Sequence, residues 1–142
     1  MVKKNSGPSL AVRAIILNNE KRILLLKRAS SDEYGNLWCL PGGKIDFGET
    51  AEETIAKEVR EETSLSCNSV KFLFYQDNLP TRPGEKHYLT LYFKCSVDGQ
   101  IKLNHESSNF VWADQSELNK YDIAFRNDEA MRKYWKDYNE IL

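Results

Sequence analysis

Residues 42–65 read GGKIDFGETAEETIAKEVREETSL, and this stretch decides the fold. Thr50 stands where a helix N-cap is expected, and Glu53, three residues later, can bond back to complete a capping box. An apolar stripe with a spacing of four residues follows, formed by Ala51, Ile55 and Val59. The pattern predicts an amphipathic helix over residues 50–63 that packs on a sheet.

Three carboxylates share one side of this predicted helix, namely Glu58, Glu61 and Glu62. At the helical turn per residue they fall within an arc of about 100°. Such carboxylates repel one another, and a hard divalent cation such as Mg²⁺, which prefers oxygen ligands, relieves that repulsion. The alternative is a solvated, salt-bridged surface, because Glu53, Lys57 and Glu61 form an i, i+4 ladder of alternating charge.

The residues before the helix favour the metal site. Pro41, Gly42 and Gly43 are expected to end a short strand over residues 37–40 and to let the backbone approach the helix with its carbonyl oxygens. Glu49 precedes the capping residue, where the helix amino terminus favours negative charge. Glycines, one carboxylate and then three carboxylates at helical spacing form a specific arrangement.

This arrangement resembles the box of the Nudix family, G-x5-E-x7-R-E-U-x-E-E-x-G-U, where U is aliphatic. Its positions are occupied here by Gly43, Glu49, Lys57, Glu58, Val59, Glu61, Glu62, Ser64 and Leu65. Seven of these nine residues fit, including every carboxylate. The resemblance implies an α/β fold, a Nudix-type α/β/α sandwich with a mixed β-sheet between helices. The MutT-like branch, which hydrolyses nucleoside triphosphates, is the most similar.

Two residues depart from the box. Lys57 replaces an arginine that pairs with the early glutamate in the family; lysine keeps the charge but lacks the bidentate fork, so a looser pair with Glu49 is expected. Ser64 replaces the glycine that ends the helix, and a positive φ there costs about 1 kcal/mol. Neither change removes a metal ligand.

The rest of the chain predicts a tail over residues 1–8 and a single domain over residues 9–142. A strand over residues 9–17 and a hairpin partner over 22–26 are joined by a turn. Further strands are expected over 70–76, 88–97 and 110–113, followed by a closing helix over 128–139. A mixed sheet with helices on both faces accommodates this order best.

The resemblance also implies the metal site and the chemistry. Glu58, Glu61 and Glu62 are the expected catalytic residues and, with the Gly42 carbonyl, hold one to three Mg²⁺ or Mn²⁺ ions. Glu58 serves either as a ligand or as the general base. Glu106 precedes Trp112 by six residues, as an extra metal-binding glutamate does in the triphosphate branch; an ordinary loop glutamate is the alternative.

Three residues are candidates for substrate binding, each with a plain structural alternative. Arg28 matches a ligand-contacting arginine of the same branch, or is a charge at a hairpin end. Lys44 contacts phosphate or is solvated. Asn127 reads the base or caps the final helix. A base can also stack on an aromatic side chain, but most of these belong to the core; they are Tyr34, Trp38, Tyr75, Tyr92, Phe125 and Trp135.

Composition limits the partners. The formal net charge is −1, which excludes a strongly basic nucleic-acid footprint, so no stable nucleic-acid binding is expected. No signal peptide and no run of 18 apolar residues occurs, which predicts a cytoplasmic protein without membrane contact. Three cysteines without a C-x-x-C pair indicate reduced thiols. Both a monomer and a homodimer are open.

Three functions follow. The first is hydrolysis of a nucleoside triphosphate, possibly a damaged one, to monophosphate and pyrophosphate. The second is cleavage of ADP-ribose or another nucleoside diphosphate derivative, since Pro80 follows Leu65 by fifteen residues, a spacing similar to that branch. The third is a Nudix-fold sensor that binds a nucleotide without cutting it, which the loss of box carboxylates would favour; none is lost here.

Overall fold

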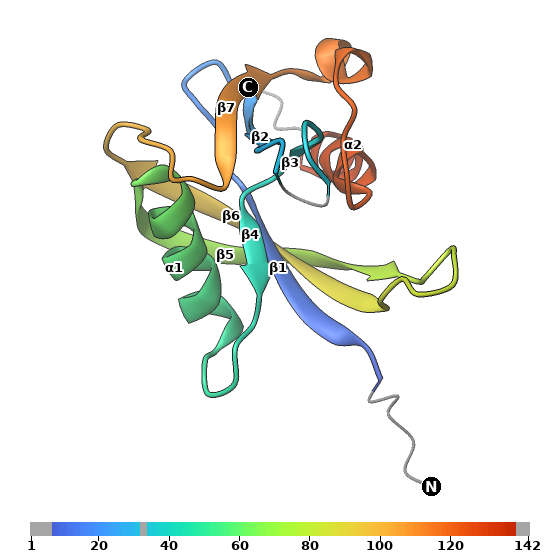
Figure 1. Cartoon of the computed structure of the whole chain (residues 1–142). Helices are drawn as coiled ribbons and strands as arrows, with labels where there is room; N and C mark the ends of the chain where they lie inside the picture. The colour runs from blue at the N-terminus through green and yellow to red at the C-terminus, as the bar shows by residue number, and fades with distance from the viewer. Residues whose placement is uncertain (1–6, 32–33, 139–142) are drawn as a thin grey trace, which may run out of the picture.

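A computed structural model describes residues 7–31 and 34–138 of the chain (Figure 1). Most of the predicted tail, residues 1–6, and Asn139 of the predicted closing helix lie outside these ranges. The elements in chain order are β1 (Ser9–Ile15), β2 (Ile23–Arg28), β3 (Trp38–Cys39), β4 (Gly42–Lys44), α1 (Ala51–Thr63), β5 (Ser66–Asn78), β6 (Tyr88–Asp98), β7 (Ser107–Ala113), the 3-10 helix η1 (Gln115–Lys120) and α2 (Asn127–Asp137). No helix in the described ranges has the length and apolarity needed to cross a bilayer.

The strands form two sheets. The larger has the order β4-β1-β6-β5 and is mixed, because β1 runs parallel to β6 while the other neighbours are antiparallel. The smaller, β3-β2-β7, is antiparallel. The predicted mixed sheet between helices is confirmed, with the strands divided between two sheets.

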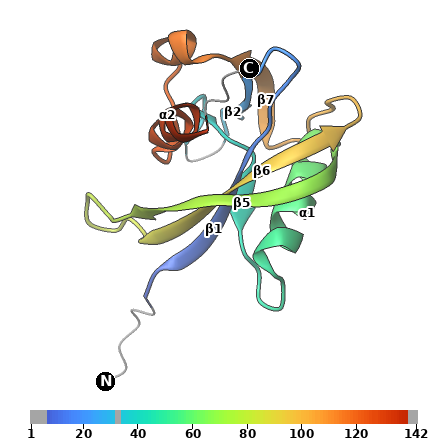
Figure 2. The same cartoon turned by 180° about the vertical axis from the view of Figure 1, so that it is seen from behind.

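Successive residues of β1 and β2 point to opposite faces of these strands, and each face packs against a different helix. Val12, Ala14, Leu24 and Leu26 pack with Ile55 and Val59 of α1. The intervening residues Ile15, Ile23 and Leu25 pack with Met131 and Tyr134 of α2. Both faces of these strands are therefore buried, and the two helices lie on opposite sides of them (Figures 1 and 2). This is the predicted α/β/α arrangement.

Helix α1 begins and ends as its sequence predicts. The Thr50 side chain accepts a hydrogen bond from the Glu53 N–H at 3.0 Å, and the Glu53 carboxylate accepts one from the Thr50 N–H at 2.9 Å. Ser64 ends the helix in the left-handed region with φ of 69°, while its N–H donates to the Arg60 carbonyl. The capping box and the positive φ of Ser64 are both confirmed.

The predicted hairpin between residues 9–17 and 22–26 is confirmed only next to its turn. The turn forms, with the Asn18 side chain accepting bonds from the N–H groups of Glu20 and Arg22. However, β1 already has β4 on one edge and β6 on the other, so β2 meets this segment only in an isolated bridge between Leu17 and Ile23. Strand β2 instead pairs with β3 and β7 in the smaller sheet.

Gly42 and Gly43, which were expected to end a strand, themselves form part of strand β4. The chain leaves the smaller sheet at Cys39 and enters the larger one as β4, in which Gly42 lies opposite Arg13 and Gly43 opposite Val12. This edge strand runs beside α1 (Figure 1). The sequence predicted the close approach of the glycines to the helix but not their pairing with β1.

Thr50→Ala is expected to destabilise the protein by about 1 kcal/mol, because it leaves the Glu53 N–H without its capping partner. The melting temperature should fall by about 3 °C, as measured by circular dichroism. Thr50→Ser keeps the hydroxyl and serves as the control. A Thr50→Ala protein as stable as the control would show that the capping box contributes nothing.

Candidate active site

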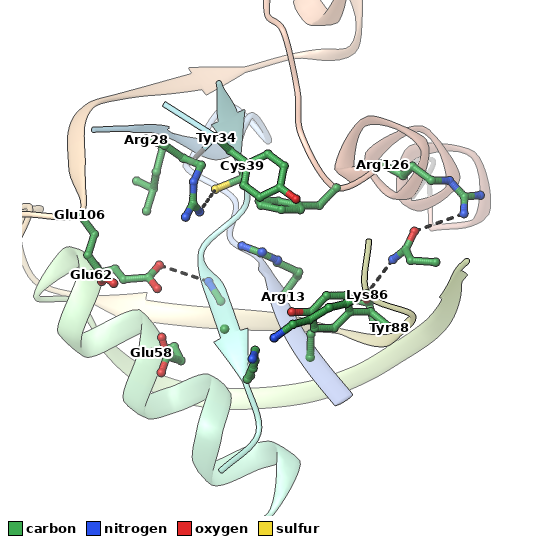
Figure 3. Close-up of a pocket in the computed structure, with 18 of the residues that line it drawn as sticks. Arg13, Arg28, Tyr34, Cys39, Glu58, Glu62, Lys86, Tyr88, Glu106 and Arg126 are labelled. Atoms are coloured by element: carbon green, nitrogen blue, oxygen red, sulfur yellow. Dashed lines mark hydrogen bonds between the residues drawn. The ribbon is translucent and has the colours of Figure 1, made fainter. Parts of the chain in front are cut away.

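One cavity of about 690 Å³ opens beside β1, β4 and α1. Its size falls in the range of small-molecule sites, roughly 300–1,000 Å³. Both sheets, α1, the loop between β5 and β6 and the segment before α2 contribute to its wall. Figure 3 shows Glu58, Glu62 and Glu106 on one side of the cavity and arginine and aromatic side chains beyond them.

Glu62 is the most deeply placed of the acidic groups, with 9% of its surface exposed. Its Oε1 accepts a hydrogen bond from the Gly42 N–H at 3.2 Å. Burial raises the pKa of Glu62 well above the ordinary value, and the nearby Glu58 raises it further, while the charge of Arg13 acts in the opposite direction. Burial also raises the pKa of Glu58. Two carboxyl groups that resist ionisation therefore share one wall.

Gly43 makes room for the Glu58 carboxylate, and Gly42 makes room for the neighbouring strand β1. A Cβ atom on Gly43 would lie 2.7 Å from Oε1 of Glu58, and one on Gly42 would lie 2.0 Å from the Val12 carbonyl oxygen. The Ala14 N–H donates a hydrogen bond to the Pro41 carbonyl, and the Ile45 N–H donates one to the Leu10 carbonyl. Hydrogen-bonded and non-hydrogen-bonded pairs alternate along an antiparallel ladder, so Gly42 and Arg13 form a pair without backbone hydrogen bonds to each other. The backbone of Gly42 is thus free to face Glu62.

The structure brings some of the predicted metal ligands together and leaves one aside. Glu58, Glu62 and Gly42 line the cavity, and so does Glu106, whose charge contributes to the raised pKa of Glu58. Glu61 is exposed and lies outside the cavity wall, although its charge also reaches Glu58. Within residues 7–31 and 34–138, no three acidic, His or Cys side chains already converge as a metal cluster.

The donor set nevertheless fits a hard divalent cation. Carboxylate oxygens of Glu58 and Glu62 share a wall that a Cβ atom on Gly43 would obstruct. Their burial and mutual repulsion are what a cation would offset. Mg²⁺ usually binds one or two carboxylates and completes its shell with water and substrate phosphates, so a full cluster of protein ligands is not required.

The loop before α1 is held by Lys57. Its Nζ lies 3.1 and 2.9 Å from the two carboxylate oxygens of Glu49 and 3.1 Å from Oδ2 of Asp46. Glu49 also accepts a bond from the Thr54 hydroxyl. These bonds lower the pKa of Glu49 and raise that of Lys57. The single Nζ of Lys57 therefore bridges the carboxylates of Glu49 and Asp46, whereas an arginine would bind one carboxylate through two nitrogens.

The predicted substrate residues divide in the same way. Arg28 and Lys44 line the cavity. Asn127 does not: it is fully buried, its Oδ1 accepts from the Leu40 N–H at 2.9 Å, and its Nδ2 donates to the Tyr92 hydroxyl at 3.2 Å. It is also not the cap of α2, since Arg126 holds that position. Asn127 is a buried link between β3, β6 and α2.

Sequence reasoning missed Arg13, and listed Phe125 only among many aromatic residues. Arg13 lines the cavity, donates from Nη1 to the Leu40 carbonyl at 2.7 Å, and holds its guanidinium carbon 4.7 Å from the centre of the Phe125 ring. The guanidinium carbon of Arg28 lies 5.3 Å from the same centre. One signal was available: Arg13 is the single charged residue in the otherwise apolar stretch SLAVRAIIL.

The loop between β5 and β6 closes another side of the cavity. Glu85 accepts bonds from the N–H and the hydroxyl of Thr81 at 2.7 and 2.8 Å and pairs with Arg82. These bonds lower the pKa of Glu85 to about 2. Thr81, Glu85 and Lys86 all line the cavity, so this loop contributes to the site and is more than a hairpin connection.

Comparison with known proteins agrees with this geometry. A family model described as the NUDIX domain matches residues 7–134. An ADP-ribose pyrophosphatase of Methanocaldococcus jannaschii is 32% identical over 92% of this chain and 76% of its own length. The nucleoside triphosphatase NudI of Escherichia coli is 27% identical over 82% and 90%. A MutT protein structure from Methanosarcina mazei superposes with a TM-score of 0.82 at 23% identity, covering 95% and 99% of the two chains.

Glu62→Gln is expected to raise the melting temperature in EDTA at pH 7.5. A carboxyl whose folded pKa exceeds its unfolded value of 4.5 destabilises the fold at higher pH, and this penalty disappears as the pH falls towards 4.5. The advantage of the variant over the wild type should therefore shrink towards pH 4.5. A variant that melts lower than the wild type across this range would contradict the electrostatic account.

Mg²⁺ is expected to reverse this order. A cation held by Glu62 stabilises the wild type by mass action and stabilises Glu62→Gln less. Glu52→Gln, an exposed position in the first turn of α1, is the control and should respond as the wild type does. Equal increases in melting temperature for all three proteins would remove Glu62 from the metal shell.

Proposed function

The chain belongs to the Nudix family and is a hydrolase of phosphoanhydride bonds in nucleotide derivatives, and on that premise we propose that it cleaves a nucleoside triphosphate to the monophosphate and pyrophosphate with Mg²⁺. The single observation that carries the proposal is the division of one cavity into an acidic wall and an arginine-rich wall. A metal-bound polyphosphate matches both walls at once.

The acidic wall is assigned to the metal. In this proposal Glu58, Glu62 and the Gly42 carbonyl are the inner ligands, Glu106 reaches in from the opposite loop, and Glu61 joins from the outer side of α1. Mn²⁺ can replace Mg²⁺. When bound, the cation neutralises phosphate oxygens and lowers the pKa of a water molecule.

Glu58 is the stronger candidate for the general base. It is only partly buried and lines the cavity, and its raised pKa improves a carboxylate as a proton acceptor. Glu62 is held by the Gly42 N–H and is almost completely buried. Glu58 therefore accepts the proton of the attacking water at a carboxylate oxygen, while Glu62 stays a fixed ligand.

The basic and aromatic side chains of the cavity are assigned to the substrate. Arg28, and Lys44 at the end of β4, supply positive charge for phosphate oxygens, and Tyr34 beside Phe125 supplies an apolar surface for a base. Asn127 does not belong to this group, because its amide is committed to Leu40 and Tyr92. Base recognition is thus proposed to rely on stacking.

A second candidate substrate is ADP-ribose. It is supported by the 32% identical relative named ADP-ribose pyrophosphatase, whereas the triphosphate is supported by the relative named nucleoside triphosphatase and by the Arg28 and Glu106 positions in the cavity. A sensor that binds without cutting is disfavoured, because Glu58 and Glu62 are both present and line the cavity.

Incubation of the protein with Mg²⁺ and a panel of dNTPs, oxidised nucleotides, ADP-ribose and nucleotide sugars tests the proposal. Pyrophosphate release from a triphosphate is the expected result. AMP with ribose phosphate as the only products would support the second candidate. Binding without turnover would support a sensor and would contradict hydrolysis.

Glu58→Gln is expected to lower turnover of the best substrate at least about a hundredfold, because the amide can neither accept the proton nor bind the cation as an anion. The melting temperature should not fall. Steady-state rates with Mg²⁺ measure the effect, with Glu52→Gln as the control on the same helix. A rate within threefold of the control would exclude Glu58 from the chemistry.

A further inference from the structure

Arg13 lines the cavity and uses little of its hydrogen-bonding capacity within the described residues. A guanidinium has five N–H donors, and Arg13 donates one hydrogen bond, from Nη1 to Leu40. No fully buried side-chain nitrogen in the described ranges lacks a partner, so the other donors of Arg13 face the open cavity. It also forms no ion pair within residues 7–31 and 34–138.

Arg126, at the other end of the cavity, shows the contrast. Its Nε and Nη2 bind the Glu129 carboxylate at 3.1 and 2.9 Å, and its Nη1 donates to the Asp77 carbonyl and the Asn78 side chain at 2.6 and 3.2 Å. All its nitrogens are engaged within the protein. Arg126 thus fastens the end of β5 to the start of α2 and is poorly placed to bind a ligand.

The position of Arg13 is central. Burial raises the pKa values of Glu62 and Tyr92, and the charge of Arg13, which reaches both groups, acts against each rise. Its guanidinium lies against the Phe125 ring, and that ring contacts Tyr34 with centroids 4.8 Å apart. Figure 3 shows Arg13 between the carboxylates and the aromatic side chains. A group bound by Arg13 would therefore lie between the metal wall and the surface assigned to the base.

Phe125 is held in a strained backbone conformation. Phe125 and Arg126 have φ of 61° and 55°, two consecutive residues in the left-handed region, each at a cost of about 1 kcal/mol or more. The ion pair between Arg126 and Glu129 and the hydrogen bond of the buried Asn127 amide to Leu40 hold this conformation. In this conformation the Phe125 ring contacts both Arg13 and Arg28.

Resting on the proposed function, we propose that Arg13 binds the phosphate attached to the nucleoside and that Phe125 positions Arg13 for this contact. Arg13 and Arg28 both lie beside this ring, so a phosphate oxygen there would accept charge-assisted hydrogen bonds from the accessible N–H groups of Arg13. The nucleoside-side phosphate is selected because it alone must lie between the metal and the base. Pyrophosphate, on the metal side, does not depend on Arg13.

Calorimetric titration with AMP, GMP, CMP and UMP, and separately with pyrophosphate, all with Mg²⁺, tests this assignment. Arg13→Met is expected to weaken binding of the best monophosphate at least tenfold, since a charge-assisted bond is lost, and to change pyrophosphate binding less than threefold. Arg13→Lys, which keeps the charge without the fork, should give an intermediate loss. Arg132→Met removes an exposed arginine of α2 and should change neither.

Phe125→Leu tests the positioning role without removing the cation. Loss of the ring contact should weaken monophosphate binding about two- to fivefold, raise KM more than it lowers kcat, and leave pyrophosphate binding unchanged. If the melting temperature shows that Arg13→Met does not fold, Phe125→Leu still tests the assignment, because it keeps the Arg13 side chain.

Three results would overturn the assignment. They are equal losses for monophosphate and pyrophosphate in Arg13→Met, unchanged monophosphate binding in that variant, and no monophosphate binding by the wild type at millimolar concentration. Failure of the proposed function looks different: the wild type would release no pyrophosphate from triphosphates, yet would still bind a monophosphate through Arg13.

Discussion

The close approach of α1 to the glycine strand β4 is the contact on which the site depends. It places Oε1 of Glu58 only 2.7 Å from where a Cβ atom on Gly43 would lie, and it lets the Gly42 N–H reach Glu62. A side chain on Gly43 would displace the Glu58 carboxylate, and one on Gly42 would collide with the backbone of β1 at Val12. The apolar stripe of α1, with Ile55 and Val59 buried, supplies the attraction that keeps the carboxylates this close to backbone and to each other.

Two groups of like charge then face one cavity. Burial raises the pKa values of both Glu58 and Glu62; the charges of Glu61 and Glu106 add to the rise at Glu58, and Glu58 adds to the rise at Glu62. On the other side, Arg13 and Arg28 share the Phe125 ring. Within the protein, the charge of Arg13 and the Gly42 N–H act against the rise at Glu62, and the charge of Lys57 acts against the rise at Glu58. A cation bound to a polyphosphate would neutralise both groups of charges at once. The relief of their repulsion would then contribute to the free energy of substrate binding.

Local signals predicted the parts of this molecule that depend on local interactions. The capping box at Thr50, the left-handed Ser64 and the shared side of Glu58 and Glu62 all follow from spacing along one helix. Pairing of β1 did not, because its edges are taken by β4 and β6, which arrive much later in the chain. Asn127 shows the same limit: its partner Leu40 lies 87 residues away, and that contact removes it from the cavity that its sequence position suggested.

Anomalous diffraction from a crystal soaked in millimolar Mn²⁺ would test the metal site directly. We expect a metal peak within coordination distance of the Glu58 and Glu62 carboxylates and on the side of the Gly42 carbonyl. A cavity without a peak, or a peak bound only to exposed carboxylates elsewhere on the surface, would contradict this expectation.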